Sequence, residues 1–270
     1  MLKDITIGQY IAGNSLIHRL DARLKLVLAL ALIVLLFMIS SPVCYTLFVV
    51  FSLICVLISR VSLLYFIKGL RPMLFIILFT VILNLFLTPG DVIWEQNFFG
   101  FTVEITQQGL IMSVKMLLRL TLLVIITSLL TLTTSPMQLT DAIESILKPF
   151  AIIKVPSHEI AMMMSIAIRF IPTFAEETDK IIKAQKARGA DFESGNIIMR
   201  AKSMIPLLVP LFVSAFRRAD ELAVAMDARC YNSNKKRTRM KQMKMKLLDF
   251  EIFGIFILFT AALVYFQFGN

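Results

Sequence analysis

The chain has 270 residues, of which 58% are hydrophobic and 22 are phenylalanine; its formal net charge is +10 and its mean hydropathy is +0.80. Few soluble domains could cover so much apolar surface, whereas a bilayer accommodates it directly, so the composition argues against an ordinary soluble protein. Because the basic residues flank apolar segments, membrane topology and anionic lipid headgroups account for the charge, and no nucleic-acid partner is expected.

Five apolar segments are predicted to cross the membrane as helices. Most of them approach the roughly 20 residues that a bilayer core requires. They are expected at Leu24–Ile39, Pro42–Ile58, Pro72–Leu87, Leu110–Leu132 and Leu248–Phe268. The expected fold class is therefore an all-α integral membrane protein.

Charged residues between these segments predict their orientation. Arg19, Arg23 and Lys25 precede the first segment, whereas the loop after the third carries acidic residues and no basic one. Since cytoplasmic loops are enriched in Lys and Arg, we predict a cytoplasmic N-terminus and a C-terminus outside. No cleavable signal peptide is expected.

The polar stretch between the fourth and fifth segments is predicted to be a cytoplasmic domain of long amphipathic helices. One helix opens at Ser157 with Glu159 and continues to Arg188, and another begins near Ile205 and reaches Arg229. The expected organisation is residues 1–134 for the N-terminal segment and four membrane helices, 135–247 for the cytoplasmic domain and 248–270 for the last membrane helix.

Both long helices are predicted to end on an Ala-Arg pair. Ala187-Arg188-Gly189 closes the first and Ala228-Arg229-Cys230 closes the second. At about 100° per residue, each arginine falls roughly 60° from the centre of its apolar face, at the edge of a contact surface. A single such arginine would be read as a helix C-terminal cation favoured by the helix dipole. Two similar copies favour docking into a partner.

Three further sets of residues have predicted contacts. Ala215, Ala219 and Ala223 recur every fourth residue, which permits a close helix–helix crossing. The run Met162-Met163-Met164 either packs at the membrane interface or forms an adaptable surface for a partner. Arg119, within the fourth segment, either faces the bundle or a partner, or snorkels or joins a buried ion pair.

The sequence lacks the usual signs of catalysis. It contains no phosphate-binding glycine-rich loop, and no His, Cys and carboxylate cluster has metal-ligand spacing; His158 is read as a helix-start residue. No catalytic, metal or cofactor site is therefore expected. The alternatives are a self-contained channel or secondary transporter, which would show inverted sets of spans, and a membrane-embedded enzyme, which would show converging polar residues.

Several strings occur in an order and spacing that together resemble one family over nearly the whole chain: Gly8-Gln9-Tyr10, Ser15, His18-Arg19-Leu20-Asp21, Arg23, Lys25, Arg169-Phe170-Ile171-Pro172, Glu176, Ala184–Gly189 and Met226–Arg229. The chain resembles the transmembrane T component (EcfT) of energy-coupling factor (ECF) ABC transporters, in the CbiQ/EcfT-like family. It departs from that pattern at Ala22, Leu24 and Cys230, where the family commonly has Pro, Thr and Gly. Glycine at the position of Cys230 would favour a left-handed helix end.

The resemblance implies a non-catalytic scaffold in a prokaryotic cell membrane. Two cytoplasmic ATPase subunits, which bind ATP and Mg, would dock on the coupling helices. Arg188 and Arg229 would each insert into one ATPase groove and meet acidic side chains. A small membrane S component would bind the vitamin or metal ion and move as ATP drives the helices. The sequence does not specify the cargo.

Overall fold

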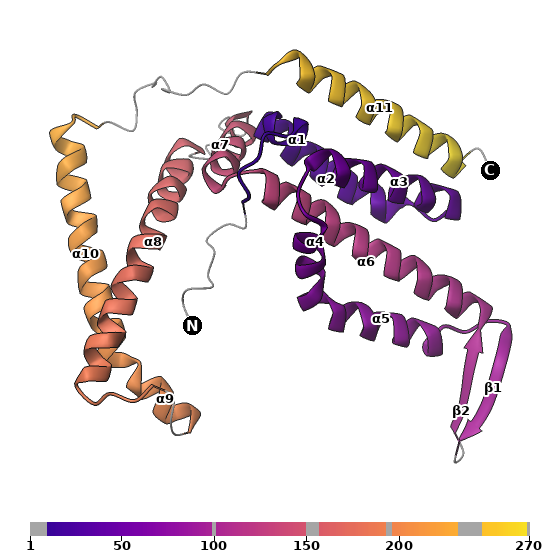
Figure 1. Cartoon of the computed structure of the whole chain (residues 1–270), viewed down its shortest axis with the longest axis horizontal. Helices are drawn as coiled ribbons and strands as arrows, with labels where there is room; N and C mark the ends of the chain where they lie inside the picture. The colour runs from indigo at the N-terminus through magenta and orange to yellow at the C-terminus, as the bar shows by residue number, and fades with distance from the viewer. Residues whose placement is uncertain (1–9, 99–100, 150–156, 193–195, 232–244, 269–270) are drawn as a thin grey trace. The chain divides into compact units, whose positions relative to one another are not determined.

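The computed structural model describes residues 10–98, 101–149, 157–192, 196–231 and 245–268, most of which are helical (Figure 1). Their contacts divide the chain into two units. The membrane unit is formed by Gly8–Ala142 with Met243–Asn270, and the long-helix unit includes Ile143–Gln242.

The membrane unit begins with a helical hairpin. Helix α1 covers Leu16–Arg19, α2 covers Ala22–Met38 and α3 covers Pro42–Ser59. The Asp21 carboxylate caps α2 by accepting a hydrogen bond from the Arg23 N–H at 2.9 Å. Pro42 opens α3 at a position where a missing N–H costs little.

The next membrane segment starts earlier than the sequence indicated. Helix α4, Leu63–Leu70, continues through the 3₁₀ turn η2, Arg71–Met73, into α5, Leu74–Leu87. Lys68 and Arg71, which precede the predicted start of this segment at Pro72, both lie in helical turns. Long basic side chains reach polar surroundings from such positions, so they do not end a helix.

A β-hairpin, which the sequence analysis did not anticipate, follows α5. Strand β1, Val92–Phe98, pairs antiparallel with β2, Phe101–Thr106. The chain then enters α6, Gln107–Thr133, whose first turn is capped by the Thr106 hydroxyl accepting from the Gly109 N–H at 3.0 Å. Helix α11, Leu247–Phe268, completes the unit.

The core of the membrane unit lies where α2, α3, α6 and α11 meet (Figure 1). Its innermost side chains are at most 2% exposed, and they come from all four helices: Leu36, Cys44, Tyr45, Phe48, Leu122 and Leu263. Packing at this junction holds the bundle together.

Long helices dominate the other unit. Helix α7, Pro136–Leu147, contains the boundary between the units, after Ala142. It is followed by α8, Ser157–Ala187, α9, Ile197–Ser203, and α10, Ile205–Ala228. Helices α8 and α10 meet close to α9 and diverge toward their other ends (Figure 1).

Among the described residues, five helices are long and apolar enough to cross a membrane: Pro42–Ser59, Leu63–Leu87, Gln107–Thr133, Ile198–Ala228 and Leu247–Gln267. The number agrees with the prediction, but the set differs. Helix α2 has only 17 residues, whereas Ile198–Ala228, predicted to be cytoplasmic, qualifies by length and composition. Within it, residues 205–216 carry no charge, whereas charged side chains follow at Arg217, Arg218, Asp220 and Glu221.

Candidate functional site

The first predicted arginine motif is the C-terminal cap of α8. The Gly189 N–H donates to the Lys186 carbonyl and the Ala190 N–H to the Gln185 carbonyl, both at 3.0 Å. These two bonds define a Schellman motif, in which the residue after the cap adopts a left-handed conformation. Gly189 has φ +84°, so Arg188 occupies the cap position itself.

The second motif has the same geometry at the end of α10. The Cys230 N–H donates to the Asp227 carbonyl at 2.8 Å, and the Tyr231 N–H to the Met226 carbonyl at 3.0 Å. Cys230 has φ +54° although it carries a side chain. The departure from glycine therefore leaves the cap geometry unchanged, and Arg229 is the equivalent of the first arginine.

Both motifs present their cations freely. All six residues from Ala187 to Gly189 and from Ala228 to Cys230 are exposed. Within the described part of the chain, neither the Arg188 nor the Arg229 guanidinium makes a hydrogen bond or an ion pair. Each cation stands at the negative end of a helix dipole, which favours it there without neutralising it.

The two arginines lie at opposite ends of an antiparallel helix pair. The Gln185 amide, near the end of α8, donates to the Pro206 carbonyl at the start of α10 at 3.4 Å. Helix α10 has 24 residues and so extends roughly 36 Å from that point to Arg229. Two separate partner surfaces can therefore be contacted at once.

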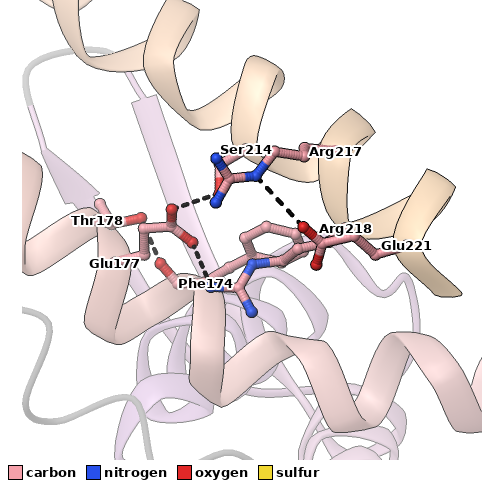
Figure 2. A network of polar contacts seen from close by, with 7 residues as sticks. All are labelled: Phe174, Glu177, Thr178, Ser214, Arg217, Arg218 and Glu221. Atoms are coloured by element: carbon pink, nitrogen blue, oxygen red, sulfur yellow. Dashed lines mark hydrogen bonds and ion pairs between the residues drawn. The ribbon is translucent and has the colours of Figure 1, made fainter.

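A polar junction fixes α8 against α10. Glu177 of α8 accepts hydrogen bonds from the Ser214 hydroxyl and, at 3.1 Å, from Arg218 Nη2, both on α10 (Figure 2). The Arg218 guanidinium also lies 5.9 Å from the centre of the Phe174 ring. The Ser214 hydrogen bond and the Arg218 charge hold the pKa of Glu177 below its usual value, against partial burial.

The alanine stripe contributes little to this junction. Ala215 is half-buried, whereas Ala219 and Ala223 are exposed. The residues of α10 that contact α8 at this junction are the half-buried Ser214 and Arg218, next to the alanine stripe. Sequence analysis did not identify Glu177; the available signal was an acidic residue one turn after Phe174, on the apolar face of α8. The helical wheel of one helix does not indicate which polar residue its partner will pair with.

Arg119 faces the bundle. Its Nη2 donates to the Tyr45 hydroxyl at 2.8 Å and to the Ile39 carbonyl at 3.1 Å, and the guanidinium lies 5.6 Å from the Phe37 ring centre. Of the alternatives considered, the structure thus selects a bundle contact through neutral acceptors. Arg119 and the Tyr45 hydroxyl both donate to the Ile39 carbonyl, where α2 ends.

The remaining predicted residues lie on α8. Met163 is 57% exposed, whereas Met162 and Met164 are half-buried. His158 is the second residue of α8, with Nδ1 3.4 Å from the Glu144 carboxylate. No group of three or more potential metal ligands occurs among the residues that the structure describes.

The N-terminal motif residues tie the first helices to the ends of α6 and α11. His18 Nε2 donates to the Ile11 carbonyl at 3.0 Å, and in the neutral ring Nδ1 accepts from the Ser15 hydroxyl at 2.6 Å. Lys25 Nζ, which is buried, donates to the Thr133 carbonyl at 2.9 Å. Burial lowers the pKa of His18. These residues therefore stabilise the membrane unit.

Comparison with known proteins gives consistent matches over almost the full length. The family model described as cobalt transport protein matches residues 13–240. The energy-coupling factor transporter transmembrane protein EcfT of Ruminiclostridium cellulolyticum is 53% identical, with 96% of each chain covered. The proteins of the same name from Thermosediminibacter oceani and Streptococcus thermophilus are 55% and 45% identical, covering 93% and 91% of this chain and 94% and 92% of theirs.

Proposed function

The chain belongs to the EcfT family of transmembrane components of energy-coupling factor transporters, and from that premise we propose that it couples ATP hydrolysis by two ATPase subunits to movement of a substrate-binding S component. The ATPases would bind ATP and Mg, and the S component would bind a vitamin or metal ion. This chain would supply no catalytic group. Its N-terminus and the long-helix unit would face the cytoplasm, and its C-terminus the outside.

One observation carries the proposal: Arg188 and Arg229 are exposed cap residues with the same geometry, each at the C-terminal end of its helix and neither paired with another described residue. A guanidinium makes forked hydrogen bonds with carboxylates and keeps its charge when partly desolvated. Each arginine would enter the groove of one ATPase and meet acidic side chains there. The Met162–Met164 run would offer an adaptable contact for the S component.

The test is retention of the ATPases by the full chain, co-expressed with both ATPases and the S component. Removing one member of a desolvated charge pair costs about 2–5 kcal/mol, so Arg188→Ala and Arg229→Ala should each weaken ATPase binding by at least about tenfold. Arg217→Ala is the matched control, because Arg217 lies on α10, is exposed and pairs with Glu221 at 3.5 Å on the same helix.

Retention of both ATPases at the wild-type level by the Arg188→Ala/Arg229→Ala double variant would refute docking through these arginines. Uptake and ATPase assays separate the alternatives. A scaffold alone transports nothing and hydrolyses no ATP, and it gains both activities only with its partners. Uptake by the isolated chain would indicate a self-contained transporter instead.

A further inference from the structure

A cavity of about 440 Å³ lies within the membrane unit, between α11 and helices α1, α2, α3 and α6. Its volume is within the roughly 300–1,000 Å³ of small-ligand pockets. The wall is almost entirely apolar, with Phe51, Ile126, Leu129, Ile252 and Phe256 among the lining residues. The proposed coupling function leaves this cavity unused.

Helix α11, which forms one wall of the cavity, is attached to the rest of the unit at both ends. Near its start, Asp249 Oδ1 accepts from the Asp21 N–H at 2.9 Å. Near its end, Gln267 Oε1 accepts from the N–H groups of Ser40 and Ser41 at 3.2 and 3.3 Å. Both attachments join α11 to residues that flank α2.

The two ends of the cavity differ chemically. At one end the wall includes Lys25 and Thr133, joined by their 2.9 Å hydrogen bond, and Glu251. Toward the other end, Phe51 stacks on Phe259 with ring centres 4.0 Å apart. The cavity therefore runs from helix ends that carry polar groups to an apolar, aromatic wall inside the bundle, which suits an amphiphile with one long apolar chain.

The rim shows how an occupant would enter. Ile54 and Ile58 on α3 and Ile255 on α11 line the cavity and are 48%, 41% and 57% exposed. Both helices are long and apolar enough to cross a membrane. Exposed apolar side chains on such helices face hydrocarbon, so the rim is continuous with the lipid-facing surface.

We propose that this cavity holds one acyl chain of a membrane phospholipid, which enters between α3 and α11 with its headgroup at the Lys25 end. An acyl chain gains little from leaving lipid, because lipid tails are as apolar as the wall. Occupancy is favoured because the alternative is an empty cavity whose lining lacks dispersion contacts. The site would be distinct from both arginine motifs and independent of the proposed function.

The experiment uses two tryptophan reporters on α11. The single native tryptophan is first replaced by Trp94→Phe. Phe256→Trp places a reporter in the cavity wall, and Phe253→Trp, one turn away, is the control because Phe253 does not line the cavity and is 43% exposed. Each full-length variant is reconstituted in vesicles of phosphatidylglycerol brominated in its acyl chains, and fluorescence quenching is measured before and after dilution with excess unbrominated phosphatidylglycerol.

We expect the Phe253→Trp signal to recover as the surrounding lipid is exchanged. The Phe256→Trp signal should remain quenched, because a held chain is released less readily than bulk lipid. Its residual quenching should be about threefold greater than that of Phe253→Trp. Ser52→Phe, which adds bulk to the wall at a 6% exposed position, should remove this difference. If that variant does not fold, Ala29→Leu on the opposite wall replaces it.

Equal recovery of the two reporters would overturn the proposal, because the cavity would then hold no lipid beyond what surrounds the protein. Persistent quenching that survives a correctly folded filling variant would overturn it as well, since the quencher would then lie outside the cavity. Neither result depends on ATPase binding, so failure here is distinct from failure of the proposed function.

Discussion

The cap after Arg229 is predicted to gain stability from Cys230→Gly. Cys230 has φ +54°, and a left-handed conformation costs a residue with a Cβ about 1–2 kcal/mol. Glycine avoids this cost but loses about 0.5–1 kcal/mol through its greater freedom in the unfolded chain. The net gain is therefore about 0.5–1 kcal/mol, or roughly a two- to fivefold lower population of the frayed end.

The matched control is the other cap. Gly189 has φ +84°, and a Cβ added there would meet nothing within 4 Å. Gly189→Ala therefore tests backbone strain without a steric clash, and we expect it to raise fraying by roughly two- to fivefold. The two substitutions should thus act in opposite directions at two caps that have the same hydrogen bonds.

Hydrogen exchange measures both effects on the full-length chain in detergent. The reporting amides are Tyr231 N–H, which donates to Met226, and Ala190 N–H, which donates to Gln185. Exchange should slow at the first amide in Cys230→Gly and quicken at the second in Gly189→Ala. If Cys230→Gly leaves exchange at Tyr231 unchanged or faster, the left-handed conformation is not the cost that we assign to this cap.

Three further predictions concern the polar contacts. Glu177→Gln should lower the free energy of unfolding by about 1–3 kcal/mol, because Arg218 loses its only carboxylate among the described residues; adding Arg218→Met should recover part of the loss in a thermal-melting double-mutant cycle. Burial holds the pKa of His18 below 6.5, so its stabilising contribution is complete above that pH and is lost as the pH falls below it. His18→Gln should therefore show a smaller drop in melting temperature from about pH 7.5 to about pH 5.5 than the wild type. Arg119→Met should cost about 1–3 kcal/mol because the Tyr45 hydroxyl loses its donor and the Ile39 carbonyl keeps only its 3.3 Å hydrogen bond from Tyr45, and Arg119→Lys should restore only part of this loss in the same melting assay.

Much of the architecture was predictable because it depends on local sequence. Apolar length identified α3, α6 and α11, and the Ala-Arg pairs marked where α8 and α10 end. These features need only residues within one helix or one turn. The sequence predicted a cytoplasmic α10, whereas Ile198–Ala228 is long and apolar enough to cross a membrane.

Contacts between distant residues could not be predicted in this way. The partners of Arg119 are 74 and 80 residues away, and only the packing of α6 against the end of α2 brings them together. Glu177 and Arg218 are 41 residues apart in the sequence, and their pairing likewise depends on the register between α8 and α10. The β-hairpin was missed because the loop was read for its charge, although strand pairing depends on alternation and turn geometry.

The position of the α8–α10 junction bears on how movement could pass between the two arginines. Sliding one helix by a turn, about 5.4 Å, would break the 3.1 Å contact between Glu177 and Arg218 and leave two charges partly buried without partners. Tilting one helix about the junction leaves that contact nearly unchanged while displacing the distant helix end. If the proposed docking holds, a force applied at Arg229 would therefore change the angle between α8 and α10 rather than their register. The part of α10 from Arg218 to Ala228 would carry this angular change to Arg229, at its end.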